Sequence, residues 1–159
     1  MTTQTETPVT FQVETWQKPE EFARLVAECM EAYGKMWANG FSGRSGVKFD
    51  PDMQVTAVTI RDGIRRFVTA RIGGKIVALQ SWIVIDDVES RGRRVAHMTG
   101  IWKENKTVCD TTQFIRYGVH AMKAAGCQHV VASCLNEAVG LQQKMEAAGG
   151  QAVETIMRF

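Results

Sequence analysis

The first half of the chain combines one strand pattern with two helical patterns. Apolar and polar residues alternate over 11–16, which predicts a short strand. Over 19–38 the apolar residues recur at helical spacing after a proline and two glutamates, as is typical of a first helical turn. This helix should pack one face on a sheet. A second helix is predicted over 50–63, opened by Asp50 and Pro51.

Three β-rich runs fill the centre of the sequence. The runs over 64–72 and 75–88 are joined by Gly73 and Gly74, a two-residue turn that strongly favours a hairpin. The third run, over 94–102, follows a polar turn and should pair with the second. These runs predict an antiparallel meander.

The last third alternates helices and strands. A helix predicted over 108–126 leads from the third meander strand into a strand over 127–135, so this crossing should form a parallel unit. The remaining expectations are a helix over 136–150 capped by Asn136, a last strand over 151–159, and Phe114, Ile115, Val119 and Met122 as the inward residues of the helix over 108–126.

Together these elements predict one α/β domain, with a mixed, mostly antiparallel central sheet flanked by helices. The chain has 159 residues, 45% of them hydrophobic, which suits a single domain with a sizeable core. We expect the domain to span 11–159, preceded by a flexible, threonine-rich arm over 1–10.

Charge and composition exclude several classes of function. The formal net charge is +2, which gives no overall attraction to nucleic acid or to an acidic membrane surface. No segment approaches the roughly 18 apolar residues of a membrane span, and no leader opens the chain, so we expect a cytoplasmic protein. The cysteines lack the paired spacing of a zinc site and are interpreted as buried free thiols: Cys29, Cys109, Cys127 and Cys134.

Three segments resemble a known family. They are "RIGGKIVAL" in the hairpin, "MKAAGCQHVVAS" between helix and strand, and "LNEAVGLQQKMEAAGGQAVETIMRF" at the end. With the order of elements, they resemble the GNAT superfamily of N-acetyltransferases over about residues 11–159. The stretch over 50–78 is similar to GNAT-type proteins encoded by tailed bacteriophages. The resemblance implies a single-domain GNAT-like fold.

The resemblance also implies acetyl-CoA as a cofactor. In such enzymes the pyrophosphate lies on backbone N–H groups of a glycine-containing loop at a helix N-terminus. The matching positions are 106–111, where Lys106 takes the basic place but no residue is glycine. The candidate cofactor-binding positions are Lys106, Cys109, Asp110, Thr111 and Thr112.

The same loop suits a helix that caps itself. The carboxylate of Asp110 favours the helix dipole and repels a pyrophosphate. The hydroxyls of Thr107, Thr111 and Thr112 are further candidates to accept hydrogen bonds from free N–H groups. A capped helix start is therefore the alternative to a cofactor site, and the one that we favour.

The residues that would perform the chemistry also depart from the family pattern. Met145 stands where such enzymes often carry a tyrosine that protonates the leaving thiolate, and Gly150 replaces an aromatic residue. His97 is the candidate general base, on a strand that would face the substrate, although a histidine in an apolar strand is more often structural. Weaker alternatives for the base are Asp86, Asp87 and Glu154.

The sequence contains one local cluster of positive charge. The turn over 90–94 holds three arginines, and Arg65 and Arg66 precede it on a neighbouring strand. Such a cluster can contact phosphate, but turn arginines are more often simply solvated. No aromatic residues lie among them to stack nucleic acid bases.

Two functional hypotheses follow. The first is an acetyl-CoA-dependent N-acetyltransferase acting on an amine. The second is a GNAT-fold protein with a degenerate cofactor loop and no cofactor, serving as a structural or interaction component such as a bacteriophage virion protein. We favour the second, because the missing glycines and the missing tyrosine are independent departures. Its expected partners are proteins, such as other virion proteins, and not membranes or nucleic acid.

Overall fold

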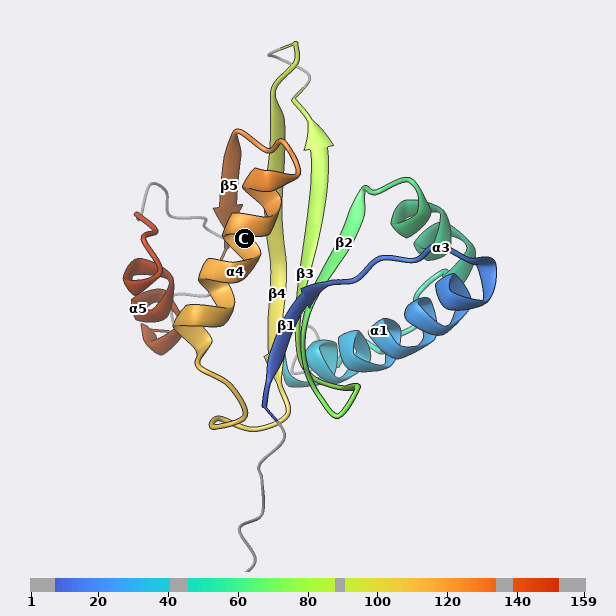
Figure 1. Cartoon of the computed structure of the whole chain (residues 1–159), viewed down its shortest axis with the longest axis horizontal. Helices are drawn as coiled ribbons and strands as arrows, with labels where there is room; N and C mark the ends of the chain where they lie inside the picture. Colours follow the sequence, from blue (N-terminus) through green and yellow to red (C-terminus); the bar gives the residue numbers. More distant parts are fainter. Residues whose placement is uncertain (1–7, 41–45, 88–90, 134–138, 152–159) are drawn as a thin grey trace, which may run out of the picture.

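A five-stranded mixed sheet forms the centre of the molecule (Figure 1). The computed structural model describes residues 8–40, 46–87, 91–133 and 139–151. The strands are arranged in the order β1-β2-β3-β4-β5, antiparallel except for the parallel pair β4–β5. Both the predicted α/β class and the predicted parallel crossing are therefore confirmed. The strands are β1 (Thr10–Val13), β2 (Arg65–Ile72), β3 (Lys75–Asp86), β4 (Arg94–Lys103) and β5 (His129–Ala132).

Helices cover both faces of this sheet. In Figure 1, α1 and α3 lie to one side of the strands, and α4 and α5 lie to the other. The core is accordingly double: one buried cluster lies under α1 and includes Phe67 and Leu79, and the other lies under α4 and includes Trp82 and Phe114. The helices are α1 (Pro19–Asn39), α3 (Met53–Arg61), α4 (Thr111–Ala124) and α5 (Val139–Ala147).

The central hairpin forms as predicted. Gly73 and Gly74 adopt φ angles of +56° and +83°, the paired positive values of a two-residue turn whose twist matches that of the strands. Next to the turn, Ile72 lies opposite Lys75, and a shift between Ala70 and Arg71 moves the pairing by one residue, so that Arg65 lies opposite Ile83. The turn residues therefore set the register of β2 against β3 as far as this shift.

Several predicted boundaries differ from the observed ones. The helix expected over 50–63 begins at Met53, because the carboxylate of Asp52, and not Asp50, accepts hydrogen bonds from the N–H groups of Gln54 and Val55. The helix expected over 108–126 begins at Thr111 for a similar reason, described below. Asn136, the last predicted strand, Cys134, Glu154 and residues 1–7 of the predicted arm lie outside the described residues.

A partly buried ion network ties the edge strand to α1. The guanidinium of Arg71 donates to Glu14 at 2.9 Å and to Glu28 on α1 at 2.8 Å, and Thr69 also donates to Glu14. Close by, Cys29 is fully buried, and burial, followed by the charge of Glu14, raises the pKa of its thiol far above the usual range. The predicted buried thiols are confirmed for Cys29 and Cys127, whereas Cys109 is half-buried.

A buried amide joins the sheet to α4. Gln80 on β3 is fully buried, and its Nε2 donates to the carbonyl oxygen of Phe114 at 2.7 Å. Its Oε1 accepts from the indole N–H of Trp82 at 3.0 Å. Gly118 leaves room for this bridge, since a Cβ atom built there would lie 1.9 Å from Gln80 Oε1. The bridge requires a residue without a side chain in the middle of the helix.

We predict that Gly118→Ala lowers the free energy of unfolding by about 2 kcal/mol, because overpacking a rigid core costs more than the helix gains from alanine. Denaturant unfolding measures this value. The control is Gly140→Ala in α5, where a Cβ would meet nothing within 4 Å. That variant should be neutral or more stable by up to about 1 kcal/mol. Equal effects of the two substitutions would contradict the role given to Gly118.

Candidate functional site

The described pairing of β4 with β5 covers only the first half of β4. The two strands pair from Val95 opposite His129 to Met98 opposite Ala132, and no described residue of β5 pairs with β4 beyond that point. The β3–β4 register shifts at the same level, so that Thr99 is an extra residue on β4. Its hydroxyl donates to the carbonyl and to the hydroxyl of Ser81. The bulge lies directly beyond the last described pair of β4 with β5, and local sequence patterns did not indicate it.

His97 lies in the paired part of β4, opposite Val131 of β5. Its ring Nε2 is 3.0 Å from the hydroxyl of Ser133, which directly follows β5. The imidazole is half-buried and Ser133 is exposed, so the pair is open to solvent. An imidazole paired in this way is able to accept a proton from a bound amine. The expectation that His97 lies on a strand face is met, and Ser133 is the partner that the sequence did not reveal.

Two of the carboxylates considered as alternative bases, Asp86 and Asp87, lie at the C-terminal end of β3. Asp86 pairs with Arg94 at 2.9 Å, and Asp87 lies 3.3 Å from Arg93. In the β3–β4 register, Asp86 is opposite Arg94, three residues before His97. The fold thus holds these two carboxylates in ion pairs at the end of the sheet, away from His97.

The loop from β4 to α4 folds around a lysine that precedes it. The ammonium of Lys103, the last residue of β4, donates to the carbonyl oxygens of Lys106 at 2.8 Å and Cys109 at 2.7 Å. Its third bond goes to the hydroxyl of Thr111 at 2.9 Å. All three donors of the ammonium are therefore used within the loop.

The start of α4 is capped by side chains of the same loop. Asp110 has an extended backbone conformation, and its carboxylate accepts a hydrogen bond from the N–H of Gln113 at 2.7 Å. The side chain of Asn105 accepts from the N–H and the hydroxyl of Thr107. The predicted capped helix start is confirmed for Asp110.

The predicted role of the threonine hydroxyls was wrong for two of them. The hydroxyl of Thr107 donates to Asn105, and the hydroxyl of Thr111 accepts from Lys103, so neither is recorded accepting a bond from a helix N–H. These hydrogen bonds form because the side chains of Asn105 and Lys103 both reach into the loop. Lys106 is exposed, with its carbonyl turned toward Lys103, and Thr112 is half-buried on the first turn of α4.

Cys109 is not placed as a nucleophile. Burial raises the pKa of its thiol, more than the nearby Lys103 ammonium lowers it. A thiol that stays protonated is a weak nucleophile. Its contribution to the loop is the backbone carbonyl that binds Lys103.

The polarity of the loop opposes the binding of a pyrophosphate. Such a site needs backbone N–H groups that converge on the anion. Here the carbonyls of Lys106 and Cys109 converge on a cation, and the carboxylate of Asp110 occupies the helix N-terminus. The described side chains and carbonyls of this loop therefore present acceptors where a diphosphate needs donors.

The positions of Met145 and Gly150 are explained by packing. Met145 on α5 is half-buried and packs against the core under α4. Gly150 donates its N–H to the carbonyl of Met145 at 2.9 Å, and a Cβ at Gly150 would lie only 2.9 Å from that oxygen. The close approach of backbone at the end of α5, which the sequence analysis missed, is the reason for a glycine here.

Metal and membrane sites were also considered. The described residues contain no group of three or more histidine, cysteine, aspartate or glutamate residues able to hold a metal ion. No helix in the described part of the chain is both long and apolar enough to cross a membrane.

Comparison with solved structures identifies similar folds. An aminoglycoside acetyltransferase from an uncultured soil metagenomic sample, in complex with sisomicin, superposes with a TM-score of 0.71 at 10% identity, covering 95% of this chain and 93% of that one. Aminoglycoside N-acetyltransferase AAC(6')-Iy, in complex with CoA, gives 0.68 at 11% identity, covering 100% and 97%. A predicted acetyltransferase from Clostridium acetobutylicum, with acetyl-CoA, gives 0.61 at 10% identity, covering 96% of each chain.

Sequence comparison adds no relative. No protein-family model and no curated protein sequence matches the chain. The likeness to the solved structures therefore bears on the fold, at identities too low to transfer an activity.

We predict that Lys103→Met lowers the free energy of unfolding by about 1–3 kcal/mol, because it leaves two carbonyls and a hydroxyl without their shared charged donor. Denaturant unfolding gives the value, and faster amide hydrogen exchange over 104–113 would locate the effect in the loop. The control is Lys48→Met, at an exposed lysine, which should stay within about 0.5 kcal/mol of the parent. If both variants behaved alike, Lys103 would not organise the loop.

Proposed function

Because the chain has the GNAT fold, we propose that it is a non-catalytic interaction protein whose β4–α4 loop does not accept acetyl-CoA. One observation carries the proposal: the Lys103 ammonium is bound by the carbonyls of Lys106 and Cys109 and by Thr111. The place where a diphosphate would need N–H donors is built from acceptors around an internal cation.

The electrostatics of the helix N-terminus support the same proposal. A partial positive charge at the start of α4 would attract a diphosphate. The Asp110 carboxylate already lies there and accepts the N–H of Gln113. A diphosphate would have to overcome this negative charge and break the cap.

The residue at the position that, in such enzymes, often donates a proton to the leaving thiolate also supports the non-catalytic proposal. Met145 has no proton to donate and instead packs against the core under α4. An acetyl-transfer reaction would therefore need a different residue as its general acid. The loop and the acid position depart from the enzyme pattern for separate physical reasons.

A second candidate function is an acetyl-CoA-dependent N-acetyltransferase acting on an amine. The observation that favours it is the pair of His97 and Ser133, 3.0 Å apart and open to solvent next to the described pairs of β4 with β5. Several solved structures of similar fold are acetyltransferases, two of them with CoA or acetyl-CoA bound, although another is described as a transcriptional regulator. This candidate requires the β4–α4 loop to rearrange before the cofactor binds.

The similarity of the segment over 50–78 to phage-encoded proteins suggests where a partner would be found. We propose a protein partner within a bacteriophage virion. Mass spectrometry of purified particles would detect this chain at a stoichiometric level if the proposal holds. Its presence only in the lysate, with empty or mature particles lacking it, would overturn the virion assignment.

The cofactor question is decided by calorimetry. We predict no heat of binding for acetyl-CoA at concentrations up to the high micromolar range, because the loop presents carbonyls and a carboxylate. The measurement uses the full chain, with desulfo-CoA or acetyl-CoA as titrant. An N-acetyltransferase assay with a panel of amines should likewise give no product.

Micromolar binding of acetyl-CoA that is lost in Lys106→Glu would contradict the non-catalytic proposal. Lys48→Glu is the matched control, because it changes the net charge equally at an exposed lysine outside the loop. If both variants weakened binding to the same degree, the effect would come from net charge and not from the loop. In the case of binding with turnover, His97→Ala would test the histidine directly.

A further inference from the structure

A hollow that the proposed function does not use lies at the end of the sheet where β3 ends and β4 begins. It has a volume of about 540 Å³ and is lined by Asp86, Asp87, Arg91, Gly92, Arg94 and Gly126. These residues come from the end of β3, the start of β4 and the end of α4. The β4–α4 loop lies at the opposite end of β4, about 30 Å away along a ten-residue strand (Figure 1).

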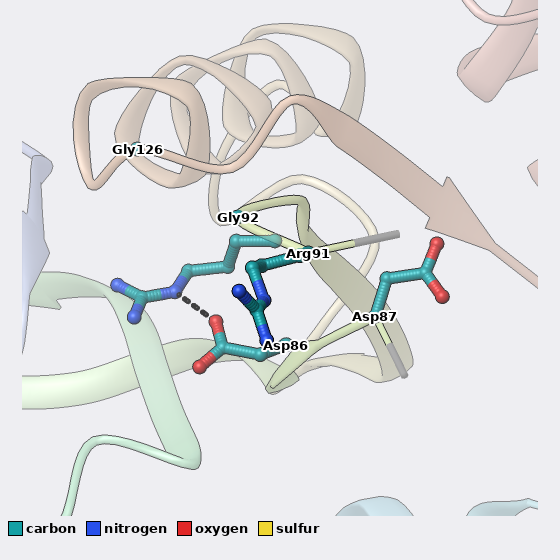
Figure 2. A pocket seen from close by; sticks show the side chains of 6 residues that line it. Asp86, Asp87, Arg91, Gly92 and Gly126 are labelled. Carbon is teal, nitrogen blue, oxygen red and sulfur yellow. Dashed lines mark hydrogen bonds and ion pairs between the residues drawn. The ribbon is translucent and has the colours of Figure 1, made fainter. Parts of the chain in front are cut away.

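Among the described residues around this hollow, Arg91, Arg93 and Arg94 outnumber Asp86 and Asp87; Glu89, two positions before Arg91 in the sequence, lies outside the described residues. Asp86 is paired with Arg94 at 2.9 Å, and Asp87 lies 3.3 Å from Arg93. In Figure 2 the carboxylate of Asp87 points away from Asp86 and Arg91. Arg91 makes no ion pair with any residue in the described part of the chain. Among the described residues, one guanidinium is therefore without a carboxylate partner.

A further arginine adds to the positive potential. Arg66 on β2 donates its Nε–H to the carbonyl of Gly63 and has no carboxylate partner among the described residues. Burial raises the pKa of the Cys127 thiol, whereas the charges of Arg66 and Arg94 lower it and that of Asp86 raises it. Cys127 directly follows Gly126 in the wall of the hollow.

The backbone carbonyls at the C-terminal end of α4, near this hollow, accept hydrogen bonds. The end of α4 carries the negative side of the helix dipole. Its last carbonyls accept hydrogen bonds from the N–H groups of Ala125, Gly126 and Cys127, and Lys123 lies in the last turn. The backbone carbonyls that would otherwise repel an anion are thus paired.

Glycine backbone, without side chains, forms part of the wall of the hollow. A Cβ built at Gly92 or at Gly126 would meet nothing within 4 Å, so no side chain fills the space in front of them. A hollow of this volume falls in the range of small-molecule sites, about 300–1,000 Å³. Two guanidinium groups, those of Arg91 and Arg94, line it from the same short segment.

We propose that this hollow binds the phosphate group of a small molecule, held by Arg91 and Arg94. Guanidinium groups match the oxygens of a phosphate with paired N–H donors, and a doubly charged phosphate compensates the unpaired Arg91 as well as competing with Asp86 for Arg94. The glycines let the ligand approach the backbone.

The test uses inorganic pyrophosphate and inorganic phosphate as probes, titrated at constant ionic strength and followed by NMR shifts of arginine Nε–H and backbone amide signals. We expect Arg91→Gln to weaken pyrophosphate binding about fivefold, as for loss of one exposed charged contact. Asp86→Asn should strengthen it about threefold or more, because it releases Arg94 and removes the nearest negative charge.

The control is Arg24→Gln, which removes the same charge from an exposed arginine on α1. Thermal unfolding of each variant confirms that it remains folded. The proposal is overturned if the parent chain shows no binding, if Arg91→Gln leaves binding unchanged, or if Arg24→Gln weakens it equally. Binding of acetyl-CoA that disappears in Arg91→Gln but survives Lys106→Glu would belong to this hollow and leave the β4–α4 loop without a cofactor.

Discussion

The hydrogen bond from Gln80 to the carbonyl of Phe114 determines where α4 lies on the sheet. Both residues are fully buried, so the side-chain amide of Gln80 cannot hydrogen-bond to solvent and must find partners in the protein. Trp82 supplies the second partner, and Gly118 provides the space. Because this bridge fixes α4 against β3, it also fixes the start of the helix and the path of the loop that joins it to β4.

Much of the fold follows from short-range patterns in the sequence. Gly73 and Gly74 specify a turn, and the turn brings the β-rich runs on either side together as an antiparallel pair. The close approach of Gln80 to Gly118 is different, because these residues are 38 positions apart and nothing in either local pattern marks it. Taken separately, a polar residue in a strand and a glycine in a helix would each be expected to lower stability; their role becomes clear only when the fold brings the two together.

The candidate site shows the same division. Asp110 caps a helix that starts at the next residue, so its role could be predicted from adjacent positions. Lys103 belongs to a strand by its pattern, and its role depends on the loop turning back over its side chain. Ser133 meets His97 only because β4 and β5 are parallel neighbours. Contacts that depend on tertiary placement were the ones that the sequence could not reveal.

The loop around Lys103 has a consequence for how readily such a protein could change its chemistry. Glycines introduced at Cys109 and Thr111 would free the backbone, but its carbonyls would still turn toward the ammonium. Removing the ammonium alone would leave those carbonyls without a partner, at a cost to stability. A loop that turned its N–H groups toward an anion would therefore require simultaneous substitutions on the strand and in the loop. The internal cation thus ties the conformation of the loop to the last residue of β4.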